Sequence, residues 1–196
     1  MSKRIITISR EFGSGGRTIG KEVAEKLGYA YYDRELIEKT AEETGFSEAF
    51  IEKYGEHSPG KTVFSYAFFG RTETGMSMQD YIWLEQCRII RELADKEPCV
   101  IVGRCADYIL RDRDDCLHVF IHASTEKKAE RIVKLYGERD VKPEKRLAER
   151  DKARSVNYRY YTDREWGRAQ NYHLSLDSGE FGIERCVEMI AELAKL

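Results

Sequence analysis

Apolar residues along this chain form either short continuous runs or longer stretches with helical spacing. The continuous runs are rich in Val, Ile and Tyr, and they predict β-strands at Arg4–Ser9, Tyr29–Tyr32, Cys99–Val102, Leu117–Ile121 and Tyr172–Leu176. Helical spacing predicts helices over Thr18–Leu27, Gln79–Lys96, Thr125–Leu135 and Ile183–Leu196. Strands that alternate with helices favour an α/β fold, a parallel sheet with helices on both faces.

Two regions interrupt this alternation. Residues 34–96 place more than one helix between consecutive strands and include a loop at Phe69–Gln79, and residues 136–171 form a polar, basic and Tyr-rich excursion. Insertions over the carboxyl edge of an α/β sheet are typical of lids that close over a substrate. We expect a lid at 136–171, whereas 34–96 fits a substrate-covering insertion and a purely structural one equally well. The sequence predicts one domain over residues 1–196.

The first strand ends in a glycine-rich loop, within the stretch IITISREFGSGGRTIG at residues 5–20. A loop that leads into a helix N-terminus presents unpaired N–H groups and partial positive charge to an anion, and glycine lets the backbone approach closely. Arg17 adds a cation, and the Thr18 hydroxyl stands where a P-loop holds its Mg²⁺. The predicted phosphate-binding residues are Gly13, Ser14, Gly15, Gly16, Arg17 and Thr18.

This loop departs from the standard P-loop pattern, because Glu11 replaces the first glycine and Arg17 replaces the lysine. A β–α turn without a ligand is one alternative. A dinucleotide-binding turn is another, with Asp33 as the ribose-binding acid, although Thr18 stands where that motif needs its third glycine.

Charged residues follow two more of the predicted strands, where ligands of open parallel sheets bind. Arg104 comes after Cys99–Val102, and Asp107 would lie in the first turn of the next helix, near Arg104 or a sugar hydroxyl. Asp33 and Arg34 follow Tyr29–Tyr32. The residue type of Asp33 favours capping of the helix that starts at Arg34.

A helix over Pro143–Arg154 would place Arg146, Arg150 and Arg154 on one face. Three guanidinium groups on one face repel each other unless anions or solvent oppose them, so a polyphosphate would stabilise them. Because acids such as Glu149 and Asp151 lie between these arginines, a solvated surface of salt bridges is an equally good interpretation.

Composition narrows the class of protein. A net charge of −2 gives no electrostatic reason to bind nucleic acid or a membrane surface, and no apolar run has the length of a membrane span. Five scattered cysteines predict reduced thiols and a cytoplasmic protein. Cys116, His118 and His122 are a weak metal candidate, and ordinary strand-end residues are the favoured interpretation. Nothing indicates an oligomeric state.

These motifs, in this order, resemble the bacterial cytidylate kinases, and more closely the cytidylate kinase-like proteins. The segments that carry the resemblance span nearly the whole chain: the opening IITISREFGSGGRTIGKEVAEKLG, then YYDRELIEK, VIVGRCAD and residues 150–154. The resemblance implies a three-layer P-loop NTPase fold with a five-stranded parallel sheet, an NMP-binding helical insertion and an arginine-bearing lid. It also implies ATP with Mg²⁺ as the phosphate donor and a nucleoside monophosphate as the acceptor.

The same resemblance assigns roles to individual positions. Gly13–Thr18 match the ATP phosphate loop, with Arg17 in place of lysine and Thr18 as the metal ligand. Residues on the acceptor side or in the lid would be Asp33, Arg34, Lys39, Arg104, Asp107 and Asp151, and residues that stabilise the transferred group would be Arg17, Arg104, Arg150 and Arg154. The expected activity is transfer of a phosphoryl group from ATP to a nucleotide such as CMP or dCMP. A nucleotide-binding regulatory protein with little turnover is the alternative.

Overall fold

The computed structural model describes residues 2–45, 47–48, 51 and 77–196, with only the backbone at positions 34 and 35. Its five strands form one parallel sheet in the order β2-β3-β1-β4-β5. The strands are β1 (Ile5–Arg10), β2 (Ala30–Tyr32), β3 (Cys99–Val102), β4 (Cys116–His122) and β5 (Leu174–Asp177). The predicted α/β fold with a parallel sheet is confirmed, and each strand lies within two residues of its expected start.

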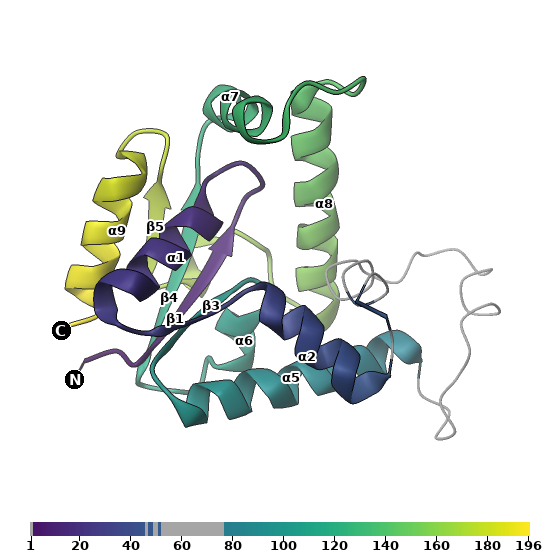
Figure 1. Cartoon of the computed structure of the whole chain (residues 1–196), viewed down its shortest axis with the longest axis vertical. Helices are drawn as coiled ribbons and strands as arrows, with labels where there is room; N and C mark the ends of the chain where they lie inside the picture. The colour runs from purple at the N-terminus through teal and green to yellow at the C-terminus, as the bar shows by residue number, and fades with distance from the viewer. Residues whose placement is uncertain (1, 46, 49–50, 52–76) are drawn as a thin grey trace.

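Helices cover both faces of the sheet (Figure 1). On one face lie α1 (Gly16–Leu27) and α9 (Gly182–Leu193), and on the other lie α2 (Arg34–Thr44), α5 (Met78–Lys96) and α6 (Ala106–Ile109). Beyond the carboxyl end of the sheet stand α7 (Thr125–Tyr136) and α8 (Pro143–Thr162), followed by the short helix η1 (Ala169–Asn171). This edge is where three-layer parallel sheets bind ligands.

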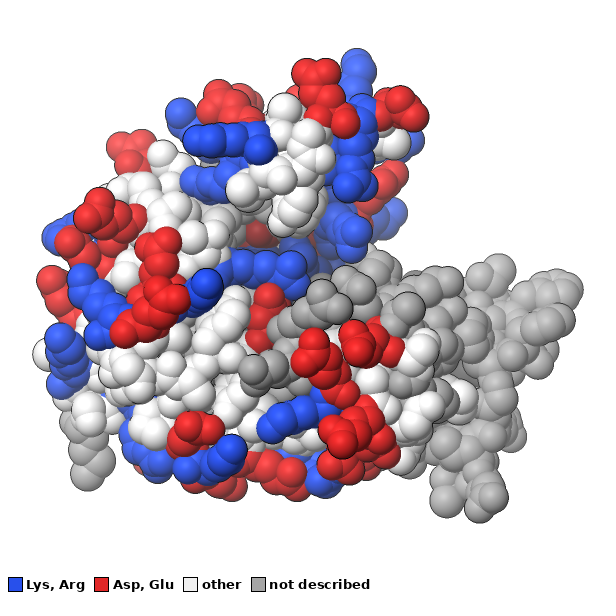
Figure 2. All heavy atoms as spheres, in the orientation of Figure 1, with Lys and Arg blue, Asp and Glu red and all other residues white. Residues whose placement is uncertain are grey.

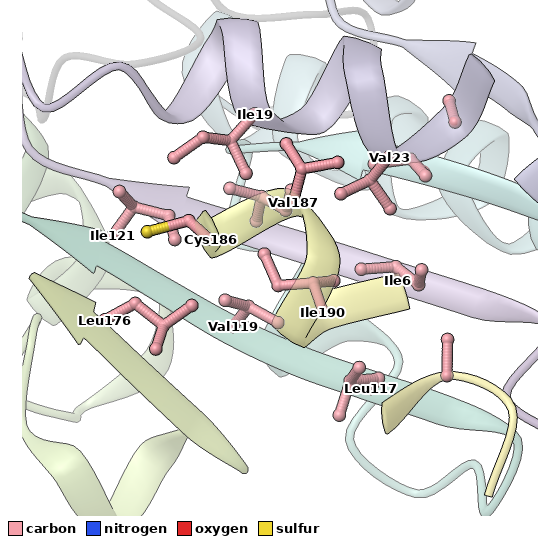
Figure 3. Close-up of a cluster of buried hydrophobic side chains, with 14 of the residues drawn as sticks. Ile6, Ile19, Val23, Leu117, Val119, Ile121, Leu176, Cys186, Val187 and Ile190 are labelled. Carbon is pink, nitrogen blue, oxygen red and sulfur yellow. The ribbon is translucent and has the colours of Figure 1, made fainter. Parts of the chain in front are cut away.

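Alternation along β1 fills two cores. Ile6 and Ile8 face α1 and α9, whereas Ile5 faces α5 and α6, and all three are fully buried. Figure 3 shows the first core, where side chains of α9 such as Ile190 meet those of the central strands. A strand buried on both faces needs the continuous apolar run that predicted β1.

The second face of β1 becomes polar toward its carboxyl end. Thr7 Oγ1 lies 2.8 Å from Nδ1 of His118 on β4, and the His118 ring stacks on His173 at 4.9 Å. Burial lowers the pKa of His118 to about 4. No cluster of three metal-ligating side chains exists within the described part of the chain. His118 is buried and hydrogen-bonds Thr7 of the neighbouring strand.

The two predicted insertions differ in how much the structure describes. In 34–96 it describes α2 and α5, whose N-cap Ser77 accepts a hydrogen bond from the Asp80 N–H at 3.1 Å. The expected loop at Phe69–Gln79 lies outside the described residues up to position 76, and Gln79 already belongs to α5. The predicted helix of the 136–171 region is α8, which continues beyond Arg154 to Thr162.

The C-terminal half of α8 is anchored to α5. Tyr161 stacks on Trp83 with ring centroids 4.4 Å apart, and its hydroxyl donates to the Gln79 carbonyl at 3.3 Å. Stacked aromatic pairs stabilise a contact beyond the area they bury. Helix α8 is thus fixed at this end to the insertion helix. No helix of the described chain has both the length and the apolar character that a membrane crossing requires.

Candidate functional site

The loop between β1 and α1 has the backbone of an anion cradle. Gly13 and Gly15 have φ angles of 82° and 81°, the left-handed region that glycine adopts without strain. Gly15 is the N-cap of α1, and no side chain caps this helix. The first N–H groups of α1, which include those of Arg17 and Thr18, therefore lack helical partners and face the loop. An anion placed in this loop would meet them.

Neighbouring elements hold the loop in this shape. Arg131 of α7 donates to the Gly13 carbonyl at 2.8 Å, and Ser178 donates to the Ser14 carbonyl. A Cβ on Gly13 would stand 2.9 Å from the Lys128 carbonyl oxygen, so only glycine fits there. Contacts within the protein thus determine the shape of the loop, and an electrostatic cradle needs donors that are fixed in place.

A cavity of about 570 Å³ opens above this loop, between the body of the molecule and the N-terminal part of α8. Figure 2 shows a cleft at this place in which Lys and Arg side chains gather. Residues from the loop, the β3–α6 junction, α7, the α7–α8 connection and α8 line it, among them Gly13, Gly15, Gly16, Arg17, Thr18, Arg104, Arg131, Arg139, Arg146, Arg150 and Arg154. The loop, the β3–α6 junction and the region from α7 to α8 thus place cations around one volume.

The prediction that Arg146, Arg150 and Arg154 share a face is confirmed, because all three line this cavity. Arg150 and Arg154 each stand 5.9 Å from the ring of Phe12, which contributes a cation–π contact from the loop. Helix α8 therefore contacts the loop between β1 and α1 directly.

Arg17 is half exposed and forms an ion pair with Asp33, its Nε 2.8 Å from Oδ2. Arg10 lies 3.9 Å from the other Asp33 oxygen and is buried. Asp33 occupies the N-cap position of α2, but its side chain makes no capping hydrogen bond. The expectation that it caps the helix is wrong, because two guanidinium groups beside its carboxylate form stronger, charge-assisted contacts.

Arg104 lies in an unusual backbone. Gly103, Arg104 and Cys105 have φ angles of 76°, 57° and 54°, so two non-glycine residues occupy the left-handed region in succession. Such residues cost about 1 kcal/mol or more each and cluster at functional sites. The turn buries Arg104, which lines both the large cavity and a polar pocket of about 30 Å³ beside Asn157 and Trp166.

Asp107 follows this turn in the first turn of α6 and is almost completely buried. Ser9 donates to its Oδ1 at 3.1 Å and Tyr158 of α8 to its Oδ2 at 2.7 Å. Burial raises the pKa of Asp107, and these two hydrogen bonds partly oppose the shift. Both oxygens thus have donors within the protein, and a contact with an acceptor sugar stays a prediction.

Asp151 of α8 accepts a hydrogen bond from the backbone N–H of Phe12 at 2.7 Å. Its carboxylate also lies 3.3 Å from Arg154 and 3.6 Å from Lys128 of α7. Burial raises the pKa of Asp151, against the lowering effect of the Phe12 N–H. Asp151, the acid of the predicted lid, therefore accepts a hydrogen bond from the loop between β1 and α1.

The structure supplies no cavity contact for Lys39 or Arg34, the other two residues predicted to contact the acceptor. Lys39 stands 5.8 Å from the ring of Tyr32 and is not among the described residues that line the cavity. The Arg34 side chain lies outside the described residues. Their acceptor roles stay predictions.

Several site residues escaped the sequence analysis: Arg10, Phe12, Lys128, Arg131 and Tyr158. Arg10 ends β1 directly before the loop, so its place at a strand end could have indicated it. Lys128 and Arg131 lie on an amphipathic helix without any motif, and only the packing of α7 on the loop reveals them.

The sheet, the glycine loop and the helical cover define the class of the protein, a P-loop kinase fold. Shikimate kinase from Bacteroides thetaiotaomicron shares it, with a TM-score of 0.56 at 16% identity over 98% of both chains. The model of the cytidylate kinase-like family matches residues 5–180.

The chain belongs to the cytidylate kinase-like family. It is 30% identical to a cytidylate kinase of Archaeoglobus fulgidus, over 97% of this chain and 94% of the relative. An uncharacterized protein from Eubacterium ventriosum has a TM-score of 0.72 and 26% identity, with 96% of each chain covered. Family and fold together identify the chain as a kinase of the nucleotide-kinase type.

Proposed function

We propose that this protein transfers the γ-phosphoryl group of ATP to a nucleoside monophosphate, with CMP or dCMP as the acceptor. The observation that carries the proposal is the set of arginines from separate elements that line one cavity with the glycine loop. Its volume of about 570 Å³ lies within the range of pockets that hold nucleotide-sized ligands. The family and the Archaeoglobus fulgidus relative support the acceptor class.

Phosphoryl transfer needs positioning and charge compensation more than covalent chemistry. The bond between the γ-phosphorus and the bridging oxygen of ATP breaks while an oxygen of the acceptor phosphate forms the new bond. That oxygen is already ionised, so no general base is required. The loop amides would hold the donor phosphates, while Arg104, Arg150 and Arg154 would oppose the charge on the transferred group.

The residues present fit Mg²⁺, since Thr18 lines the cavity at the start of α1 together with Gly15 and Gly16 of the loop. The Thr18 hydroxyl would hold the ion, whose charge helps to neutralise the donor phosphates. Arg17 stands where a P-loop has its lysine and pairs with Asp33. A donor triphosphate would compete with Asp33 for this guanidinium.

ADP release measured with CMP, dCMP, UMP and shikimate tests the proposal. We expect acceptor-dependent ADP formation with a pyrimidine monophosphate. ATP binding in calorimetry without such turnover for any of them would instead support the nucleotide-binding regulatory alternative.

A matched pair of variants in α8 tests the site. Arg154→Met should lower kcat by roughly 10²–10³, the effect of removing one preorganised donor. Arg159→Met removes an exposed arginine of the same helix and should leave turnover unchanged. Equal turnover in the two variants would contradict the assignment of Arg154.

A further inference from the structure

A chain of four alternating charges, with Lys128 buried and the other three partly buried, joins the phosphate loop to the lid helix. Lys128 Nζ of α7 lies 2.8 Å from Glu11 Oε2 and 3.6 Å from Asp151 Oδ2, and Asp151 Oδ1 lies 3.3 Å from Arg154 Nη1. The Lys128 side chain is only 9% exposed. A lysine is this buried only when paired, and the two acids around it supply the pairing.

Each end of this chain reaches a part of the site. At the loop end, Glu11 also accepts from the Ala123 N–H at 3.4 Å, which fixes it to the end of β4. At the lid end, Asp151 accepts from the Phe12 N–H and pairs with Arg154, which lines the cavity. Lys128 is not among the described residues that line this cavity. Lys128 therefore contacts Glu11 of the loop and Asp151 of α8 without lining the cavity itself.

We propose that Lys128 is a positioning residue that latches the lid helix onto the phosphate loop, so that Arg154 stands over the loop before nucleotide binds. The proposal rests on the proposed function for its kinetic part. Without the Lys128 ammonium, the partly buried carboxylates of Glu11 and Asp151 would face each other with like charge. Asp151 would then leave Phe12 or take up a proton, and either change loosens Arg154.

The first experiment needs no activity: amide exchange of the protein without nucleotide, comparing Lys128→Met with Lys127→Met. Lys127 is the adjacent lysine of α7, 57% exposed, so its substitution is the matched control. We expect exchange in peptides covering 11–18 and 143–154 to accelerate about tenfold or more in Lys128→Met, the effect of losing a charge-assisted hydrogen bond. Peptides of α9 should not change. Unchanged exchange at the loop and lid, or acceleration across the whole chain, would overturn the latch.

The second experiment asks whether Lys128 acts through Asp151. Asp151→Asn keeps the side-chain volume and an oxygen for the Phe12 N–H while removing the charge, so this variant should fold even if Lys128→Met is fragile. Lys128→Met should lower kcat about tenfold with KM for ATP changed less than about threefold, and should change kcat less than about twofold when Asp151 is already Asn. Equal losses in both backgrounds would overturn the coupling. If the wild type transfers no phosphoryl group to any acceptor, the proposed function fails, and the exchange result alone decides the latch.

Discussion

Replacing Tyr158 with Phe removes the hydroxyl that donates to the buried Asp107 at 2.7 Å and changes little else in shape. A hydrogen bond to a charged group contributes about 1.5–3 kcal/mol, and one to a neutral group about 1 kcal/mol. The cost of the substitution therefore depends on whether Asp107 is ionised. Since burial raises the pKa of Asp107, pH controls this state.

The direction of the pH dependence follows from the linkage between proton binding and folding. The native state holds the Asp107 proton more tightly than the unfolded chain, so the stability it contributes is present below about pH 4 and is lost as pH rises through the native pKa. Without Tyr158 the native pKa rises further, and the loss with pH becomes larger. We expect Tyr158→Phe to cost about 1 kcal/mol while Asp107 is protonated, near pH 4, and about 2–3 kcal/mol once pH has risen through the native pKa of Asp107.

Urea unfolding followed by circular dichroism at pH 4, 5.5 and 7.5 measures these differences, each variant against wild type at the same pH. Tyr160→Phe is the control, because Tyr160 is the half-exposed tyrosine two residues along the same helix. Equal costs of Tyr158→Phe at all three pH values would refute the charged hydrogen bond. An equal cost of the control would show that the loss is not specific to Asp107.

Two further predictions concern the loop and the sheet. Gly13→Ala should cost at least about 2 kcal/mol of stability, because its Cβ would meet the Lys128 carbonyl at a φ of 82°. Gly28→Ala is the control: its φ is 68° but its Cβ would stand in open space, so it should cost only about 1 kcal/mol. Thermal unfolding compares the two variants, and similar losses would argue against a tightly enclosed loop. Burial lowers the pKa of His118 to about 4, so its stabilising contribution is present above pH 6.5 and is lost as pH falls through 4. Over that window the loss approaches about 3 kcal/mol, and His118→Gln should flatten the pH dependence of urea unfolding by a comparable amount.

The strands, the helices and the glycine loop between β1 and α1 could be predicted from the sequence because their signals are local. Continuous apolar runs gave the buried strands, and the glycines at 13, 15 and 16 gave the loop. The spacing of the α8 arginines predicted their shared face, since helical geometry alone determines it.

The pairing of side chains could not be predicted in the same way. Tyr158 meets Asp107 across 51 positions, and Lys128 meets Glu11 across 117, so no local pattern records either contact. Asp33 is a further example, because its residue type favours a helix cap but the fold brings Arg10 and Arg17 beside it. Ion pairs between distant segments thus outweigh the local preference of this residue for capping.

Helix α8 is held at two places along its length. The stack of Tyr161 on Trp83 fixes its C-terminal end, and the hydrogen bond from the Phe12 N–H to Asp151 holds it roughly 15 Å away, at 1.5 Å per residue. If the second contact were released, a tilt of only about 5° at the first would move Pro143, roughly 27 Å from Tyr161, through about 2 Å. This shift is comparable with the difference between a direct and a water-bridged contact, so the position of the first turns of α8 depends on both contacts at once.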